Sequence, residues 1–143
     1  MTYIIGCDHG GLKLANEILS HLQNRASKII NIFPEENAKV DYPDYANLLC
    51  RQVVAESALG ILVCGSGIGM SIAANKFKGI RAALCVNEYM ARFARKHNDA
   101  NVLCLGERVI GSEVALGIVD VFLDTEFEGG RHKVRIDKIN LLG

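Results

Sequence analysis

The 143-residue chain lacks any net charge, because sixteen lysines and arginines balance sixteen aspartates and glutamates. A nucleic-acid-binding module of this size usually carries a basic excess, so we expect no nucleic-acid partner. The same balance creates no field that would draw the chain to an anionic membrane. No apolar run approaches the roughly 20 residues that a spanning helix needs, and the first residues lack the basic region of a signal peptide. We therefore expect a cytoplasmic protein without a membrane partner.

Paired cysteine and histidine motifs are also missing. The five cysteines are odd in number and include no CxxC pair, which argues against both a disulfide framework and a zinc site. No two histidines have the HxxxH spacing, and the acidic residues are scattered. The sequence thus predicts no metal site, and it places His21 and His132 on the surface, the first on a helix face and the second in a charged run.

Half of the residues are hydrophobic, which suits one compact domain over residues 1–143. Five short apolar runs without polar alternation are typical of strands buried on both faces: residues 3–7, 29–33, 61–64, 82–86 and 102–105. Segments with helical spacing separate them: residues 12–22, 45–58, 68–77, 88–97 and 112–123. This alternation predicts an α/β fold, a three-layer αβα Rossmann-like arrangement with a five-stranded parallel sheet. A C-terminal helix follows, with its apolar positions at Val134, Ile136, Ile139 and Leu142.

The two prolines, Pro34 and Pro43, bracket a polar stretch that we expect to be the one long surface loop. Open parallel sheets place their sites beyond the carboxyl ends of the strands. In this chain those ends carry polar or reactive groups, at residues 7–9, 64–66, 87–88 and 106–108. We therefore expect the functional residues there.

Three alternating glycines, Gly65, Gly67 and Gly69, follow one predicted strand and precede a helix. Such a loop lets backbone N–H groups converge beside the positive end of a helix, which favours an anion. A tight turn that needs positive φ values would explain the same glycines. The loop is no P-loop, and Met70 stands where a dinucleotide fingerprint needs its third glycine. Glu88 lies at a plausible ribose distance along the chain, so a nucleotide-binding domain stays an alternative.

Cys64 lies where loop amides and a helix N-terminus would activate a thiol. Other cysteines also end apolar runs in this chain, so Cys64 can equally be a small core residue. Arg131 and Arg135 are four residues apart on the last predicted helix. They form either a fork for phosphate or part of a solvated charged face.

Five motifs together resemble one known family: CDHGG, DYPDYA, GILVCGSGIGMSIAANKFKGIRAALC, ARKHNDANVLCLGERVIG and EGGRHKVRIDKI. The chain resembles ribose-5-phosphate isomerase type B from its first strand to its last helix. The wider superfamily includes the subunits of galactose-6-phosphate isomerase. The resemblance implies an enzyme that interconverts ribose 5-phosphate and ribulose 5-phosphate, in the non-oxidative pentose phosphate pathway, through an enediolate. It implies no metal or other cofactor, and a homodimer or dimer of dimers whose subunits share active sites.

The resemblance also implies roles for individual residues. Cys64 falls at the position of the base, and Met70 stands where another branch of the family has a glutamate base. Ser66 and the neighbouring amides match the loop that stabilises the enediolate, although cysteine-type members often have threonine at Ser66. His97 matches the residue that helps to open the furanose ring. The implied loop positions are Gly65, Gly67, Ile68 and Gly69, and the positions that contact sugar hydroxyls or phosphate are Asp8, His9, Asn98, Arg108, Arg131 and Arg135.

Two further readings remain open. A galactose-6-phosphate or allose-6-phosphate isomerase would share the fold and the motifs. A sugar-phosphate sensor without catalytic activity could keep the arginines, but the presence of Cys64 and His97 argues against it.

Overall fold

The computed structural model describes all 143 residues, and its strands form a single parallel sheet in the order β2-β1-β3-β5-β4. β5 is buried along its whole length, as are β1 and β3 except for their first residues, whereas the edge strands β2 and β4 are partly exposed. The expected burial on both faces therefore holds for the three central strands. The strands are β1 (Thr2–Cys7), β2 (Lys28–Ile32), β3 (Leu59–Cys64), β4 (Ala82–Leu84) and β5 (Val102–Gly106).

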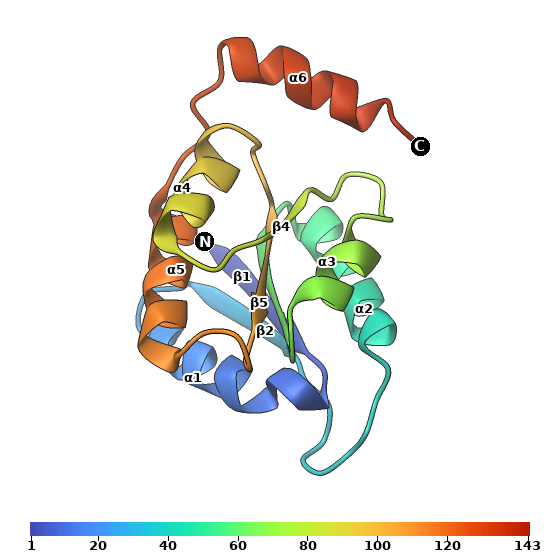
Figure 1. Ribbon diagram of the computed structural model, residues 1–143, viewed down its shortest axis with the longest axis vertical. Helices are drawn as coiled ribbons and strands as arrows, with labels where there is room; N and C mark the ends of the chain where they lie inside the picture. Colours follow the sequence, from blue (N-terminus) through green and yellow to red (C-terminus); the bar gives the residue numbers. More distant parts are fainter.

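Helices cover both faces of the sheet, so the predicted three-layer αβα fold is confirmed (Figure 1). One layer holds α1 (Leu12–Leu22), α4 (Glu88–Lys96) and α5 (Ser112–Asp124), and the other holds α2 (Tyr42–Glu56) and α3 (Ile68–Ala74). A short 3-10 helix, His9–Gly11, precedes α1.

Each face of the sheet has its own hydrophobic core, because successive side chains of a strand point to opposite sides. Ile5 of β1 packs in the core with Ile18 of α1, and its neighbour Ile4 packs in the other core with Leu49 of α2. These side chains are fully buried. The alternation along β1 thus places one helix layer on each face.

Between β1 and β3 the chain changes the side of the sheet on which it adds strands. β1 leads through α1 to β2 on one side, and β3 leads through α3 to β4 on the other. The two strands are hydrogen-bonded neighbours, with Cys7 opposite Val63. Ligands of open α/β sheets bind at such a switch point, and here Asp8 and Gly65 follow the two strands.

Several boundaries differ from the sequence prediction. α2 begins at Tyr42, three residues earlier than expected, because Pro43 fits the first turn of a helix, where its missing N–H needs no partner. β4 ends at Leu84, since the chain then turns so that the Asn87 side chain accepts a hydrogen bond from the Met90 N–H and caps α4. α3 ends at Ala74 rather than at residue 77.

The last helix, α6 (Arg131–Asn140), lies apart from the three layers, at the top of Figure 1. Of its predicted apolar positions only Ile136 is buried, whereas Val134 and Ile139 are exposed and Leu142 lies beyond the helix. Apart from Ile136, the apolar stripe of α6 is therefore left uncovered by its own chain. None of the helices combines the length and the apolar character that crossing a membrane requires.

Candidate active site

Cys64 ends β3 at the switch point and is almost completely buried. The backbone N–H of Gly67 donates to its Sγ at 3.1 Å. Gly67 adopts φ +79°, which places this N–H on the sulfur and starts α3 directly afterwards. The glycine loop thus provides both the tight turn and a polar contact to Cys64.

The remaining loop amides divide into two groups. The Ile68 N–H donates to Ser66 Oγ at 3.2 Å and, like that of Gly67, is already used within the loop. No backbone or side-chain acceptor is assigned to the N–H groups of Gly65, Ser66 and Gly69. These three donors, rather than all five loop amides, are available to an oxyanion beside Cys64.

A small cavity of about 290 Å³ opens in front of Cys64. Asp8 lies on one side of it, with its Oδ1 held by the Gly10 N–H at 2.9 Å. Arg108 lies on another side, close against Gly65, and forms no ion pair. A thiol, a carboxylate, a guanidinium and free amides therefore meet in one cavity, whose full lining is Asp8, Tyr42, Cys64, Gly65, Ser66, Gly69, Arg108 and Val109.

Tyr42 is a lining residue that the sequence analysis did not single out. Its ring lies so close to Gly69 that a Cβ on that glycine would be 2.7 Å from the ring. The signal in the sequence was its place in DYPDYA, directly before the proline that starts α2. That motif supported the resemblance but gave Tyr42 no role.

His9 faces a different hollow. Its Nδ1 accepts a hydrogen bond from the Val40 N–H at 3.1 Å, which ties it to the loop of residues 33–41. It lines a space of about 740 Å³ together with Lys13, Lys39 and other residues, and Cys64 is not among them. The structure thus places His9 beside the cavity of Cys64 rather than in its lining.

The other four thiols are core residues. Burial raises the pKa of Cys7, Cys50 and Cys85 to about 12, and it also raises the pKa of Cys104 well above its ordinary value. These thiols stay protonated at neutral pH. Cys64, in contrast, lines a cavity together with polar groups.

A second group of predicted site residues gathers around the end of α4. His97 caps that helix, and its ring stacks on the ring of His132 with the centroids 4.0 Å apart. The expectation that His132 is exposed is wrong, because the ring fits between α6 and His97 and is only 6% exposed. Its burial, first of all, and then the neighbouring His97 ring and Arg131 guanidinium lower the pKa of His132. Asn98, which follows His97, is exposed, and so are Arg131 and Arg135, which lie on α6 with His132. Neither arginine forms an ion pair.

The two groups lie at opposite ends of the strands, the Cys64 group at their carboxyl ends and the His97 group at their amino ends. Cys64 pairs with Gly106 at the carboxyl end of β5, whereas His97 and Asn98 precede the amino end of the same strand. The strand alone separates them by roughly 13 Å. Figure 1 shows α6 at the end of the molecule opposite the turn from β1 into α1. One chain therefore does not bring Cys64 and the arginine fork together.

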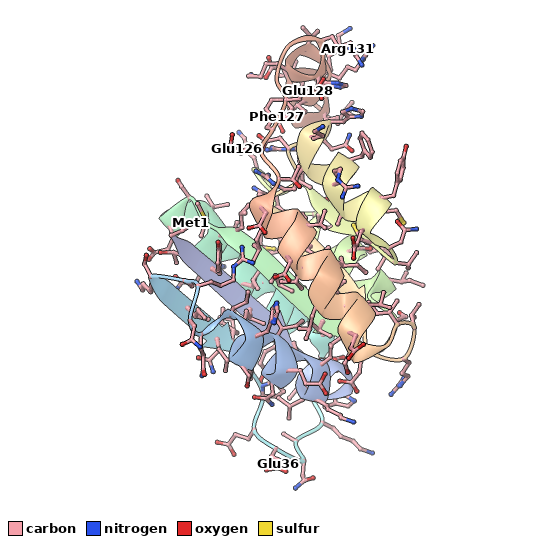
Figure 2. The ribbon with its side chains drawn as sticks, turned by 90° about the vertical axis from the view of Figure 1, so that its left-hand side faces the viewer. Met1, Glu36, Glu126, Phe127, Glu128 and Arg131 are labelled. Atoms are coloured by element: carbon pink, nitrogen blue, oxygen red, sulfur yellow. The ribbon has the colours of Figure 1, made fainter.

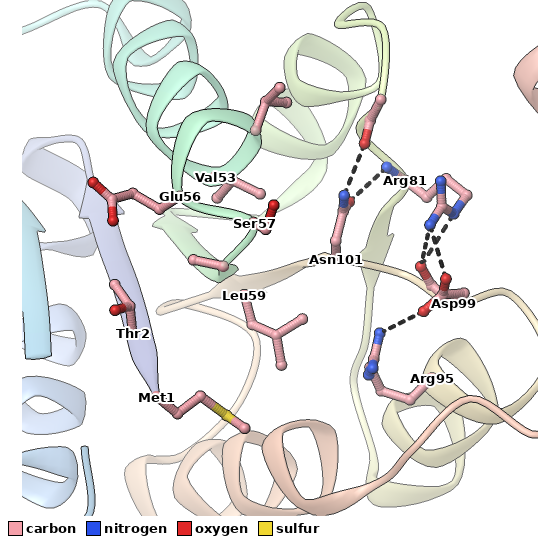
Figure 3. Close-up of a pocket in the computed structure, with 13 residues that line it drawn as sticks. Met1, Thr2, Val53, Glu56, Ser57, Leu59, Arg81, Arg95, Asp99 and Asn101 are labelled. Carbon is pink, nitrogen blue, oxygen red and sulfur yellow. Dashed lines mark hydrogen bonds and ion pairs between the residues drawn. The ribbon is translucent and has the colours of Figure 1, made fainter. Parts of the chain in front are cut away.

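A hollow of about 650 Å³ also lies at the amino ends of the strands (Figure 3). Arg81 and Arg95 line it and both bind the carboxylate of Asp99, at 3.2 and 3.1 Å. Arg81 Nε also donates to the Asn98 carbonyl at 3.1 Å. This network holds the turn that carries His97 and Asn98. It contains no candidate base or nucleophile.

The position of Glu88 argues against the nucleotide-binding alternative. Its carboxylate packs against Gly117 of α5, where an added Cβ would lie 2.6 Å from Oε1. That contact lies in the layer of α4 and α5, whereas the glycine loop leads into α3 on the other face. Glu88 thus lies with α4 and α5, away from the face of the sheet into which the loop leads.

Fold and site together define an α/β protein with a cysteine and a glycine loop at the switch point of its sheet. The sequence model of one family, described as Ribose/Galactose Isomerase, matches residues 3–139. Ribose-5-phosphate isomerase B of Escherichia coli is 46% identical over 138 residues, which cover 96% of this chain and 93% of that protein. A probable ribose-5-phosphate isomerase B of Mycoplasma pneumoniae is 48% identical and covers 94% of this chain and 90% of its own.

Solved structures agree with this assignment. Ribose-5-phosphate isomerase B of Clostridium thermocellum superposes with a TM-score of 0.95 at 50% identity, covering 98% of this chain and 95% of that one. The Mycoplasma genitalium enzyme, solved with bound ribulose 5-phosphate, has a TM-score of 0.92 at 46% identity, covering 97% and 93%. The chain belongs to the ribose/galactose isomerase family.

Proposed function

We propose that this protein is an aldose–ketose isomerase that interconverts ribose 5-phosphate and ribulose 5-phosphate, with residues 1–143 forming one isomerase domain. The observation that carries the proposal is the buried Cys64 thiol, which receives the Gly67 N–H and faces a polar cavity. Relatives that are 46–50% identical along nearly the whole chain bear the name ribose-5-phosphate isomerase B. The substrate class follows from those relatives, and the chemistry follows from the cavity.

Isomerisation requires a base beside the carbon next to a carbonyl and donors where the oxyanion develops. Cys64 as a thiolate removes the proton from that carbon, and the electron pair moves to the carbonyl oxygen. The resulting enediolate accepts hydrogen bonds from the free amides of Gly65, Ser66 and Gly69 and from the Ser66 hydroxyl. The proton of the substrate hydroxyl moves to the former carbonyl oxygen, and the Cys64 thiol returns its proton to the former carbonyl carbon. The second oxygen becomes the new carbonyl and the thiolate is restored, so atoms and charge balance.

The remaining roles are divided between the amino ends and the carboxyl ends of the strands. His97 assists opening of the furanose ring, and Asn98 binds sugar hydroxyls. Arg131 and Arg135 form the phosphate clamp, for which their exposed and unpaired guanidinium groups are suited. On the Cys64 side, Asp8 and Arg108 bind the sugar, and His9 reaches it from the adjoining hollow.

Since one chain separates these groups, we place each complete site between two subunits. Cys64 and the loop of one subunit face the partner subunit's His97, Arg131 and Arg135. The exposed apolar side chains of α6 support this arrangement, because Val134 and Ile139 have no cover within their own chain. A homodimer is the smallest assembly that provides it, and a dimer of dimers would also do so. The absence of paired cysteine motifs fits the reducing cytoplasm.

The test is an isomerase assay with ribose 5-phosphate and, in parallel, with allose 6-phosphate and galactose 6-phosphate. We expect turnover of the five-carbon substrate, and we expect Cys64→Ala to lower kcat by roughly 10²–10⁴, as loss of a general base does. Cys64→Ser should not restore the rate, because a hydroxyl is far less acidic than a thiol. Cys85→Ala, which removes another buried thiol at a strand end, is the matched control. Near-normal activity of Cys64→Ala would overturn the assignment of the base.

A further inference from the structure

Three side chains with metal-binding atoms gather beside α6: His97, Glu128 and His132. One ligand atom of each lies within 4.8 Å of the others. They come from the end of α4, from the segment before α6 and from the first turn of α6. Figure 2 shows Glu128 in that segment, just below the start of α6 at Arg131. Sequence spacing did not reveal the cluster because His97 is 31 residues distant from Glu128 along the chain.

The Nε2 atom of His132 has no hydrogen-bond partner, although the side chain is more than nine-tenths buried. The nearest carboxylate oxygen, Glu128 Oε1, is 3.8 Å away, which is too far for a hydrogen bond. Buried polar atoms without a partner are rare in folded proteins and call for an explanation such as an ion. Here the unpartnered nitrogen points toward the carboxylate of the same cluster.

The backbone fixes the three residues in place. The Glu128 N–H donates to the Lys96 carbonyl at 3.0 Å, so the segment before α6 is attached to the end of α4 next to His97. Gly129 and Gly130, both with positive φ, then turn the chain into α6. Glu128 and His132 are four residues apart and face each other across this turn. The fold therefore brings these three residues together.

We propose that His97, Glu128 and His132 bind one Zn²⁺ ion and that this binding inhibits the enzyme. Two imidazoles and one carboxylate form a common three-residue zinc set, with the fourth position open. Imidazole nitrogens favour Zn²⁺ over Mg²⁺ or Ca²⁺, which prefer oxygen ligands. The inhibition rests on the proposed function, because an ion on His97 withdraws it from ring opening. The binding of zinc does not depend on the proposed function.

Binding of the ion requires one ring to move. The two imidazoles stack with their planes 13° apart, so their nitrogen lone pairs run nearly parallel and do not converge on one point. His97 is half-buried and can turn, whereas His132 is enclosed. Arg131 and Arg135 lie on the same helix and would repel the ion, but both side chains are exposed and can swing away from it.

Calorimetric titration with ZnCl₂, in a buffer free of phosphate and chelator, tests the binding. We expect Glu128→Gln to weaken zinc binding by about tenfold or more. Glu126→Gln is the matched control, since Glu126 is exposed in the same segment and outside the cluster. Equal affinities of Glu128→Gln and the unchanged protein would overturn the proposed site, as would an equal loss in both variants.

The isomerase assay in the presence of ZnCl₂ tests the inhibition. Glu128 is not part of the proposed catalytic machinery, so Glu128→Gln should keep its activity without zinc and lose at least tenfold in sensitivity to zinc. Inhibition that is unchanged in Glu128→Gln would point to zinc on the Cys64 thiol and would refute the proposed route. Should the protein show no isomerase activity at all, the calorimetric comparison still decides on the site.

Discussion

Gly65 and Gly67 lie two residues apart in the same loop, but the structure demands glycine for different reasons. Gly67 has φ +79°, and a Cβ there would lie 2.9 Å from the backbone carbon of Leu105. Neither the backbone angle nor that neighbour can adjust easily. A Cβ on Gly65 would instead meet the Arg108 guanidinium at 2.9 Å, and an exposed arginine can move. Gly67 is thus required by the fold, and Gly65 by the position of one side chain.

We predict that Gly67→Ala lowers the free energy of unfolding by about 1–3 kcal/mol, the usual cost of a strained backbone position. Gly65→Ala should change stability by less than about 1 kcal/mol and should instead raise KM, because Arg108 is pushed away from the cavity. Urea unfolding and steady-state kinetics on both variants measure these effects. Gly111→Ala serves as the control, since a Cβ there meets nothing within 4 Å. Equal destabilisation by the two loop variants would contradict the distinction.

At the scale of single elements, the turn between α4 and β5 is held by one carboxylate. Asp99 adopts a left-handed conformation with φ 45° and binds both Arg81 and Arg95. The side chains of these arginines are only 17% and 12% exposed, so without Asp99 two largely buried cations lose their anionic partner. The same turn carries His97 and Asn98.

We predict that Asp99→Asn, which removes the charge but still tolerates the left-handed backbone, lowers the free energy of unfolding by about 1–3 kcal/mol. This is less than the cost of breaking a fully buried pair, because Asp99 itself is partly exposed. Activity should fall as well, through displacement of His97. Asp137→Asn removes the exposed pair with Lys133 and should cost less than about 0.5 kcal/mol. Urea unfolding of both variants tests the prediction, which fails if they lose the same stability.

The elements and the half of the candidate site around Cys64 could be predicted from the sequence, because both depend on local patterns. Apolar runs identified the strands, and the polar residues at their carboxyl ends identified Cys64, Asp8 and Arg108. The surroundings of His132 could not be predicted, because its burial depends on how α6 packs on the end of α4. The exposed apolar face of α6 could not be predicted either, since periodicity indicates an apolar face but not what covers it.

Across the whole molecule, buried thiols link stability to alkaline pH. Burial raises the pKa of Cys7, Cys50 and Cys85 from 9.0 to about 12 in the folded chain. Below pH 9 the thiols are protonated in both states, so they add no pH dependence. Between pH 9 and 12 only the unfolded chain ionises them, and unfolding therefore releases protons. Stability must fall as the pH rises through this window.

The fall amounts to about 1.4 kcal/mol per pH unit for each thiol once the unfolded chain is fully ionised. We predict that urea unfolding shows a clear loss of stability from pH 9 to pH 10.5 but none attributable to these groups from pH 7 to pH 8. The variant Cys50→Ala/Cys85→Ala should have a slope smaller by up to about 3 kcal/mol per pH unit. Identical slopes for the variant and the unchanged protein would exclude the thiols as the cause.

At the scale of the assembly, a shared site makes two inactive variants complementary. Cys64→Ala subunits retain Arg131 and Arg135, and Arg131→Ala/Arg135→Ala subunits retain Cys64. In a mixed dimer, one of the two sites combines the intact base with the intact clamp. If subunits exchange at random, about one site in four is complete, and activity should recover to about that fraction of the unchanged enzyme.

A mixture of Cys64→Ala with Cys64→Ser should stay inactive, because neither subunit supplies the base. Exchange is verified by native mass spectrometry of differently tagged subunits. Activity that stays absent although mixed dimers are present would mean that the base and the arginine clamp act within one chain, against the separation of about 13 Å or more that β5 alone imposes.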